Sequence, residues 1–253
     1  MILTTDHGAV RELQLNRPPA NALSLEMIVA LKNAVESAPQ DGARAIVLSG
    51  LRGRFSAGLD VPLLLTLDRP AIASLWRELY ALLRALALSP VPIAVAITGH
   101  ATAGGTVLPL FCDWRIAAAG DWKLGLNEVQ VGLLLPPLIH SGLRRLLGPH
   151  QAERLAVGGL LISPDEAARI GLVDEVVSLD QVVPAAIAWS RGLLALPVDA
   201  MAATRHQARA DLAEIFAADF DAELETVNAH WWSAEAQTTL SVLAQRLSKQ
   251  KRS

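Results

Sequence analysis

A single acidic residue in an apolar loop is the clearest candidate for chemistry in this chain. Glu128 lies within the stretch Trp122–Gly132, which contains glycines and is otherwise largely apolar. Desolvation of a carboxylate raises its pKa from about 4.3 toward neutrality, which makes it a usable base for proton transfer. The alternative is that Glu128 only begins a helix or forms a salt bridge, and this loop alone leaves both interpretations open.

Two glycine-containing turns could supply hydrogen-bond donors beside this acid. Gly104 and Gly105 follow the apolar run Val91–Ile97, and glycine lets the backbone approach a ligand while free N–H groups at a helix start point toward it. The segment Phe55–Asp60 makes a similar turn after a buried-strand pattern at Arg44–Ser49. Two such turns can aim two N–H groups at one oxygen, although each alone also fits an ordinary strand-to-helix connection.

Other kinds of site are not expected. The histidines have no metal-ligand spacing with one another or with Cys112, so no metal centre is predicted. Ser56 lacks the Gly-x-Ser-x-Gly elbow of a hydrolase, and the glycine pair lacks the Gly-x-Gly-x-x-Gly spacing of a dinucleotide site. His100 is interpreted as a hydrogen-bonded structural residue, and Asp60 as a residue that orients its loop or caps a helix.

These candidates need an α/β framework to bring them together. Unbroken apolar runs are typical of strands buried on both faces of a parallel sheet, and they occur at Ala45–Leu48, Val91–Ile97 and Trp114–Ala118. Residues 70–88 carry apolar side chains at the three–four spacing of an amphipathic helix. Pro109 predicts that the helix after the glycine pair is short or bent.

The two ends of the chain are predicted to differ. An N-terminal hairpin turns at Asp6–Gly8, whereas the chain after Gly132 is mostly helical, with a break at Pro197. A helical end without a strand partner often packs on a neighbouring subunit. We therefore predict a core domain over residues 1–195 and a helical oligomerisation region over residues 196–253.

Composition narrows the classes of function. The chain has 253 residues, of which 52% are hydrophobic and 19% charged, with a formal net charge of -3. This length can bury one sizeable core, and the charge gives no electrostatic reason to expect nucleic acid as a partner. No apolar run reaches the roughly 18 to 20 residues that cross a bilayer, and no signal-like segment is recognised after Met1. With a single cysteine, Cys112, a cytoplasmic location is expected.

Several motifs together resemble the crotonase, or enoyl-CoA hydratase/isomerase, superfamily. The motifs that carry the resemblance are Phe55–Asp60, Gly99 with Ala103–Gly105, Cys112–Ile116 and Ala167–Asp174. The resemblance covers nearly the whole chain, and it implies a right-handed spiral of ββα turns followed by a helical trimerisation region. It also implies a homotrimer or a dimer of trimers that binds acyl-CoA thioesters and stabilises an enolate oxyanion. Coenzyme A is then part of the substrate, and no separate cofactor is expected.

The resemblance assigns roles to individual residues. The two oxyanion donors correspond to the N–H groups of Leu59 and Gly104. Hydratases of the family carry glutamates at the positions of Val107 and Glu128, and this chain keeps only the second. Syn addition of water needs two groups, whereas moving a double bond from carbon 3 to carbon 2 needs one base, so the resemblance implies an isomerase. The stretch Gly125–Gly132 is likewise similar to Δ3,Δ2-enoyl-CoA isomerases of the mitochondrial type, which act in fatty-acid β-oxidation.

Two other functions stay open. The chain could be an enoyl-CoA hydratase or another crotonase-type acyl-CoA enzyme in which water is activated elsewhere. It could also be a non-catalytic, crotonase-like binding protein, although the near-neutral charge disfavours RNA as its ligand.

Further residues are predicted to bind the substrate. Four of them flank the two donors: Ala57, Gly58, Asp60 and Gly105. An apolar acyl pocket is expected from leucines that can instead belong to the core: Leu64, Leu133, Leu134 and Leu135. Arg52 and Arg54, near the first donor turn, are candidates for contact with the nucleotide phosphates.

Overall fold

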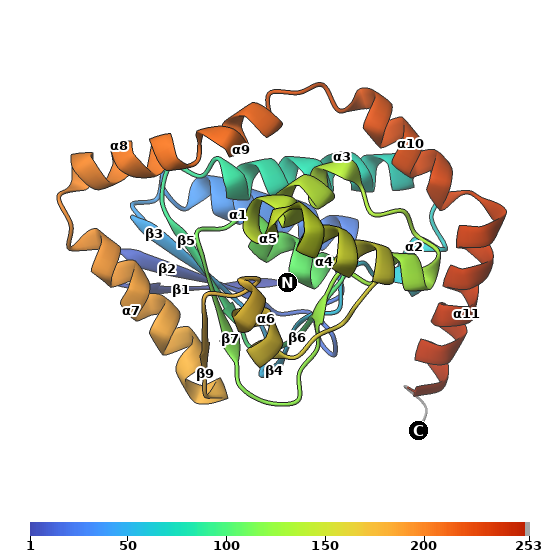
Figure 1. The fold of residues 1–253 in the computed structure, drawn as a ribbon, viewed down its shortest axis with the longest axis horizontal. Helices are drawn as coiled ribbons and strands as arrows, with labels where there is room; N and C mark the ends of the chain where they lie inside the picture. The colour runs from blue at the N-terminus through green and yellow to red at the C-terminus, as the bar shows by residue number, and fades with distance from the viewer. Residues whose placement is uncertain (251–253) are drawn as a thin grey trace.

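A six-stranded, mostly parallel sheet forms the centre of the computed structural model, which describes residues 1–250; residues 251–253, the end of the predicted C-terminal region, lie outside the described part. The strand order is β1-β2-β3-β5-β7-β9 (Figure 1). The strands are β1 (Ile2–His7), β2 (Val10–Leu15), β3 (Ala45–Ser49), β5 (Ile93–Ile97), β7 (Trp114–Ala118) and β9 (Glu175–Val177). β1 and β2 form the predicted antiparallel hairpin, and all later neighbours pair in parallel.

A second, smaller sheet has three parallel strands, β4 (Gly53–Ser56), β6 (Gly99–Thr102) and β8 (Leu124–Gly125). The chain alternates between the sheets, because β3 is followed by β4, β5 by β6 and β7 by β8. Each turn of a spiral thus gives one strand to each sheet. The hydrophobic pattern predicted only the strands of the large sheet, since those of the small sheet are short and contain glycine. The predicted turn at Phe55–Asp60 therefore begins inside β4.

Helices cover both faces of the large sheet, as the unbroken apolar strands predict. Ile46 and Leu48 of β3 belong to the core shared with α1 (Leu25–Ser37) and α3 (Arg69–Ala87). The alternate residues, Ala45 and Val47, point to the opposite face and pack with α7 (Val182–Leu194). The amphipathic pattern over residues 70–88 is thus confirmed as α3, which packs against α1 and whose buried residues belong to the same core as Ile46 and Leu48.

Several of the other helices are short or kinked. α2 (Val61–Leu64) and α4 (Gly104–Leu110) follow the two glycine turns, and α4 is short, as Pro109 predicts. α5 (Pro137–Gly158) is bent at Gly148, whose φ of 72° and ψ of 169° are not helical. The remaining short elements are the 3₁₀ turns η1 (Glu128–Val131) and η2 (Leu179–Gln181) and the helix α6 (Pro164–Ile170).

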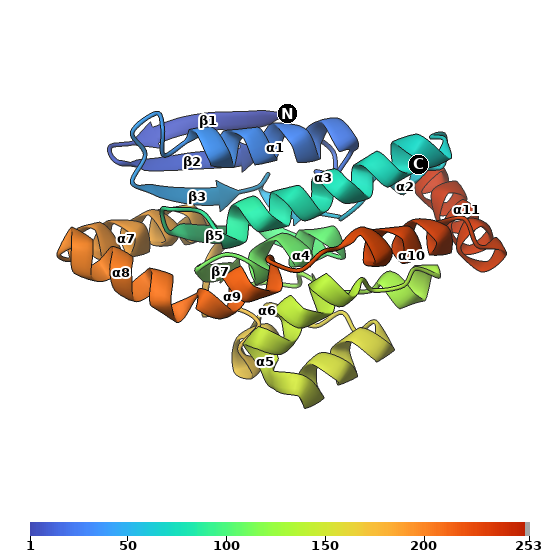
Figure 2. The ribbon, with the colours of Figure 1, turned by 90° about the horizontal axis from the view of Figure 1, so that it is seen from above.

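The C-terminal part consists of α8 (Val198–Ala208), α9 (Ala210–Ile215), α10 (Asp221–Trp231) and α11 (Ala234–Gln250). α10 packs against α3 and α11 packs against α2 (Figures 1 and 2), and α11 also packs against η1. The break between α7 and α8 falls at Pro197, as expected, while the division into a core domain and an oligomerisation region remains a prediction. Among the described helices none is singly long and apolar enough to cross a bilayer; one pair, Leu179–Leu194 with Val198–Ala208, passes by length and composition but is bent by 111°.

Candidate active site

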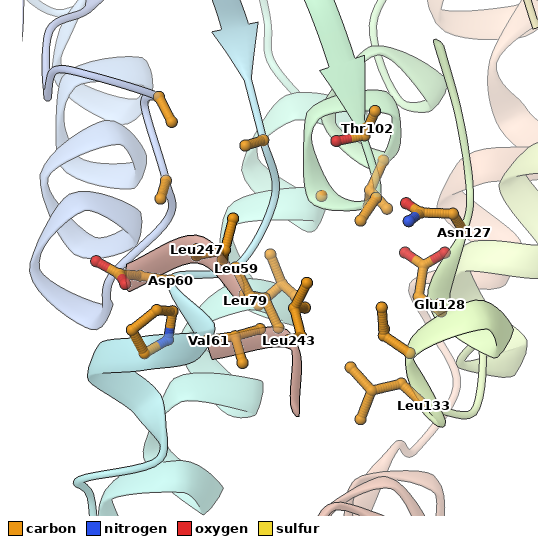
Figure 3. A pocket seen from close by; sticks show the side chains of 18 of the residues that line it. Leu59, Asp60, Val61, Leu79, Thr102, Asn127, Glu128, Leu133, Leu243 and Leu247 are labelled. Atoms are coloured by element: carbon orange, nitrogen blue, oxygen red, sulfur yellow. The ribbon is translucent and has the colours of Figure 1, made fainter. Parts of the chain in front are cut away.

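One cavity of about 620 Å³ brings together the elements that the sequence singled out. Leu59, Gly104 and Glu128 all line it, and Figure 3 shows Glu128 facing Leu59 across the opening. Each of these residues follows a strand of the small sheet, at the exits of β4, β6 and β8. Because these strands pair in parallel, their carboxyl ends meet at one edge. The small sheet therefore positions residues that are far apart in the sequence.

Two backbone N–H groups at the cavity are free to bind an oxygen. Leu23 holds the first donor turn from both sides of Leu59, since the Leu23 N–H donates to the Gly58 carbonyl at 2.7 Å and the Asp60 N–H donates to the Leu23 carbonyl at 3.0 Å. Within the described part of the chain, neither the Leu59 N–H nor the Gly104 N–H donates a hydrogen bond. Gly104 is the first residue of α4, where N–H groups have no intrahelical acceptor. This arrangement suits an anionic oxygen.

Glycine is required for the two donor turns to approach each other. Gly58 has a φ of +81°, and a β-carbon on it would lie 2.8 Å from the Gly104 nitrogen. A β-carbon on Gly105 would lie 2.2 Å from the Ser56 carbonyl oxygen, so α4 packs directly on β4. Neither Gly58 nor Gly105 is among the residues that line the cavity. Their part is to let the donors lie side by side, not to contact a ligand.

Glu128 has the environment of a base. It begins η1, and its carbonyl accepts a hydrogen bond from the Leu133 N–H at 2.9 Å, which closes the loop that carries it. The side chain is buried, and its Oε2 atom has no hydrogen-bond partner. Burial in these apolar surroundings raises the pKa of Glu128 from 4.5 to about 7. A carboxyl group with this pKa can both take up and release a proton near neutral pH.

No second carboxylate is available for acid–base chemistry among the described residues of the cavity wall. Val107 lies on that wall, 1% exposed, where it offers only an apolar surface. Asp60 also lines the cavity, but its carboxylate pairs with Arg17 at 2.6 Å and accepts a hydrogen bond from the Leu63 N–H at 3.3 Å. Asp60 therefore caps α2 and fixes the donor turn, which is the structural interpretation made from the sequence.

Asn127 is a polar residue of the cavity that the sequence did not single out. It precedes η1, yet its side chain makes no capping hydrogen bond, and its Oδ1 atom is buried without a partner. Figure 3 shows the Asn127 amide next to the Glu128 carboxyl group, both directed into the cavity. Only the folded structure shows that Asn127 leaves η1 uncapped and turns its amide toward the cavity.

The structure places only part of the predicted binding set at the cavity. Ala57, Arg54, Leu133 and Leu134 line it, as expected. Besides Gly58 and Gly105, three predicted residues do not line it, for separate reasons. Leu64 is fully buried in the core, Leu135 packs partly buried against that core, and the exposed Arg52 extends away to pair with Asp180 of η2. Other large apolar side chains of the wall were not singled out from the sequence: Val61, Trp76, Leu79, Val131, Ile139, Leu243 and Leu247.

Other candidate chemistry is not assembled in the described residues. No group of three or more His, Cys, Asp or Glu residues there could hold a metal ion. The Nδ1 atom of His100 accepts a hydrogen bond from the Lys123 N–H at 3.1 Å, and its ring packs edge-on against Trp122. Cys112 is buried, and burial raises the pKa of its thiol to about 12, so it remains unreactive.

Known proteins match this chain along most of its length. A family model described as enoyl-CoA hydratase/isomerase matches residues 5–249. The human enoyl-CoA delta isomerase 1, mitochondrial, is 31% identical over 255 residues, which cover 99% of this chain and 84% of the human protein. The probable enoyl-CoA hydratase EchA17 of Mycobacterium tuberculosis is 36% identical over 196 residues, which cover 76% of this chain and 74% of that protein.

Solved structures show the same architecture. The crystal structure of human mitochondrial delta3-delta2-enoyl-CoA isomerase superposes with a TM-score of 0.93 at 31% identity and covers 99% of both chains. An enoyl-CoA hydratase/isomerase from Mycobacterium paratuberculosis superposes with a TM-score of 0.85 at 27% identity, covering 95% of this chain and 97% of the other. The spiral of strands and the C-terminal helices are thus features shared with these proteins.

Proposed function

The chain belongs to the enoyl-CoA hydratase/isomerase family and has the crotonase fold, and from this premise we propose that it converts 3-enoyl-CoA thioesters to 2-enoyl-CoA thioesters. The observation that carries the proposal is the single buried carboxylate of Glu128, with a pKa of about 7, in a cavity where Val107 supplies no second acid. A double-bond shift needs one base that returns the proton it takes, which matches a cavity with one unpaired acid. The human isomerase relative supports the same reaction class.

In the proposed reaction, the thioester oxygen lies between the N–H groups of Leu59 and Gly104. The ionised Glu128 removes a proton from carbon 2, and the electrons move onto the thioester oxygen to give a dienolate. The two N–H groups stabilise that oxygen, each by about 3 to 4 kcal/mol in comparable enzymes. The protonated Glu128 then returns its proton to carbon 4, so the double bond moves between carbons 2 and 3 and no atom is gained or lost. Glu128 is therefore ionised again at the end of the reaction.

The cavity wall offers partners for both ends of such a substrate. Arg54 lines it and can attract the phosphates of coenzyme A, whereas Arg17, which also lines it, pairs with Asp60. Leucines and other apolar residues also line the cavity, where an acyl chain can be buried. Since coenzyme A is part of the substrate, the proposed reaction requires no further cofactor.

A hydratase is the second candidate, because a relative named as a hydratase is 36% identical to this chain. Hydration needs one group to activate water and another to manage the carbon-bound proton, and Val107 cannot provide the second. Asn127 is polar but has no proton to exchange near neutral pH. We therefore expect a hydratase activity much weaker than the isomerase activity.

The assembly and location of the protein are also proposals. Relatives in this family are commonly oligomeric, and we propose a homotrimer or a dimer of trimers in the cytoplasm. Light scattering of the purified protein after size-exclusion chromatography distinguishes these two assemblies from a monomer. A monomer with full activity would contradict this part of the proposal.

The test of the proposed function follows the absorbance of the conjugated 2-enoyl-CoA that forms from a 3-enoyl-CoA. Glu128→Gln is nearly isosteric and removes the base, so turnover should fall by about 10²- to 10⁴-fold. Glu153→Gln, at an exposed position of α5, is the matched control and should leave turnover unchanged. Hydration of 2-enoyl-CoA is measured in parallel. Undiminished isomerisation by Glu128→Gln, or hydration faster than isomerisation in the wild type, would overturn the proposal.

A further inference from the structure

The C-terminal helix α11 supplies part of the cavity wall although it lies more than a hundred residues beyond the donor turns and Glu128. Leu243 and Leu247 of this helix line the cavity. In Figure 3, Leu243 lies beside Val61 and Leu79 and faces Leu133 across the opening. These residues are all apolar, so the part of the cavity that α11 closes is suited to a hydrocarbon chain.

α11 is held against both sides of the cavity. It packs against α2, which follows the first donor turn, and against η1, which carries Glu128. At η1 the contact is close, because a β-carbon on Gly132 would lie 3.0 Å from the Thr239 Oγ1 atom and 3.5 Å from the Ala236 Cα atom. The carbonyl of Gly132 also accepts a hydrogen bond from the His230 ring at 3.1 Å, which fixes the end of α10 just before α11. The position of Leu243 is thus tied to the position of the base.

The two leucines differ in exposure along the helix. Leu243 is half-buried and packs against the main core, whereas Leu247, one turn later, is 37% exposed at the rim of the cavity. Val242, the immediate neighbour of Leu243, is 42% exposed and does not line the cavity. Because successive helix residues point in different directions, Val242 gives a control on the same helix that faces away from the cavity.

We infer that Leu243 and Leu247 of α11 determine how long an acyl chain the cavity accepts. The thioester end is held at the donor turns and Glu128, so the chain must extend toward the apolar wall that α2, α3 and α11 form. In this inference, short acyl groups leave Leu243 uncovered, whereas longer ones pack on Leu243 and leave past Leu247. This inference rests on the proposal that the site takes acyl-CoA thioesters, but it does not depend on which reaction follows.

The experiment measures binding of unreactive, saturated thioesters by calorimetry, using hexanoyl-CoA and dodecanoyl-CoA. Leu243→Trp fills the distal wall and should weaken dodecanoyl-CoA binding by about tenfold or more, since each methylene denied burial is worth roughly fourfold in affinity. Hexanoyl-CoA should bind as it does to the wild type. Val242→Trp, with the same added bulk on the outer side of the helix, should change neither affinity.

A second substitution protects the test against misfolding of the tryptophan variant. Leu243→Ala opens the wall and should raise the affinity for hexadecanoyl-CoA relative to dodecanoyl-CoA. Three outcomes would each overturn the inference. The Leu243 variants could change the affinities for short and long acyl chains equally, they could change no affinity, or Val242→Trp could have the same effect as Leu243→Trp. If the wild type binds acyl-CoA but does not isomerise it, only the proposed reaction fails. If the folded wild type binds no acyl-CoA, both proposals fail.

Discussion

Gly58 and Gly104 lie so close that a β-carbon on Gly58 would come within 2.8 Å of the Gly104 amide nitrogen. The first residue belongs to the turn after β4 and the second to the turn after β6, so the two turns that hold the proposed oxyanion donors are in direct contact. The geometry of one donor therefore depends on the backbone of the other.

Replacement of Gly58 by alanine should impair catalysis more than substrate binding. The residue has a φ of +81°, which is strained for alanine, and the added methyl group would displace the Gly104 N–H. Loss of one oxyanion donor lowers kcat by about 10²- to 10³-fold in comparable enzymes. Steady-state kinetics should show this loss in kcat. Gly192→Ala, in α7, meets nothing within 4 Å and serves as the control; a Gly58→Ala enzyme with normal kcat would refute the role of this contact.

The rate of isomerisation should depend on pH through Glu128. The base must be ionised to take the proton, and its pKa is about 7. We expect kcat/KM to fall about tenfold for each pH unit below 7 and to level off above it. The measurement is kcat/KM from pH 5 to 9 with a 3-enoyl-CoA. A profile that stays flat down to pH 5 would show that another group acts as the base.

Stability should also respond to the titration of Glu128. The folded protein releases this proton at a pH of about 7 and the unfolded chain near 4.5, so between these values the folded state holds more protons and stability falls as the pH rises. Glu128→Gln removes this cost and should raise the unfolding free energy at pH 8 by roughly 3 kcal/mol, with little change at pH 4. Urea unfolding at both pH values tests this. A variant less stable than the wild type at pH 8 would contradict the desolvation of the carboxylate.

Arg54 should contribute to the recognition of the nucleotide half of the substrate. It lines the cavity, whereas Arg52, two residues earlier, pairs with Asp180 outside it. Arg54→Ala should raise KM several-fold for a coenzyme A thioester but not for the matching pantetheine thioester, which lacks the nucleotide phosphates. Arg52→Ala should alter neither. Equal KM changes for both thioesters would assign Arg54 a structural role instead.

The large sheet and the main helices could be predicted because their signals are local. β3, β5 and β7 are continuous apolar runs, and α3 has the regular spacing of a helix with one buried face. The small sheet could not be predicted in this way, because β8 has only two residues and is positioned by its pairing with β6. A strand this short is stabilised by its neighbours and leaves little pattern in its own residues.

The site was predicted as far as backbone turns and a single acid could indicate it. Glu128 was recognised because a carboxylate stands among apolar residues, and the two donor turns because they contain glycines. The choice of the Leu59 and Gly104 N–H groups as donors came from the family resemblance. The residues that the sequence missed, among them Trp76 and Leu243, are hydrophobic and resemble any core residue until the fold shows which face borders a cavity. The same limit explains why Leu64 was expected in the acyl pocket when it lies in the core.

The alternation of strands between the two sheets gives each coil of the spiral one separable task. Successive coils leave the small sheet at β4, β6 and β8. One residue of the proposed site follows each strand within three residues: the donors Leu59 and Gly104 and the base Glu128. A side-chain exchange just past one exit can add or remove an acid while the proposed oxyanion donors, which are main-chain N–H groups, stay in place. Under the proposed function, the scaffold thereby keeps binding one kind of ligand while the reaction carried out on that ligand is free to diverge.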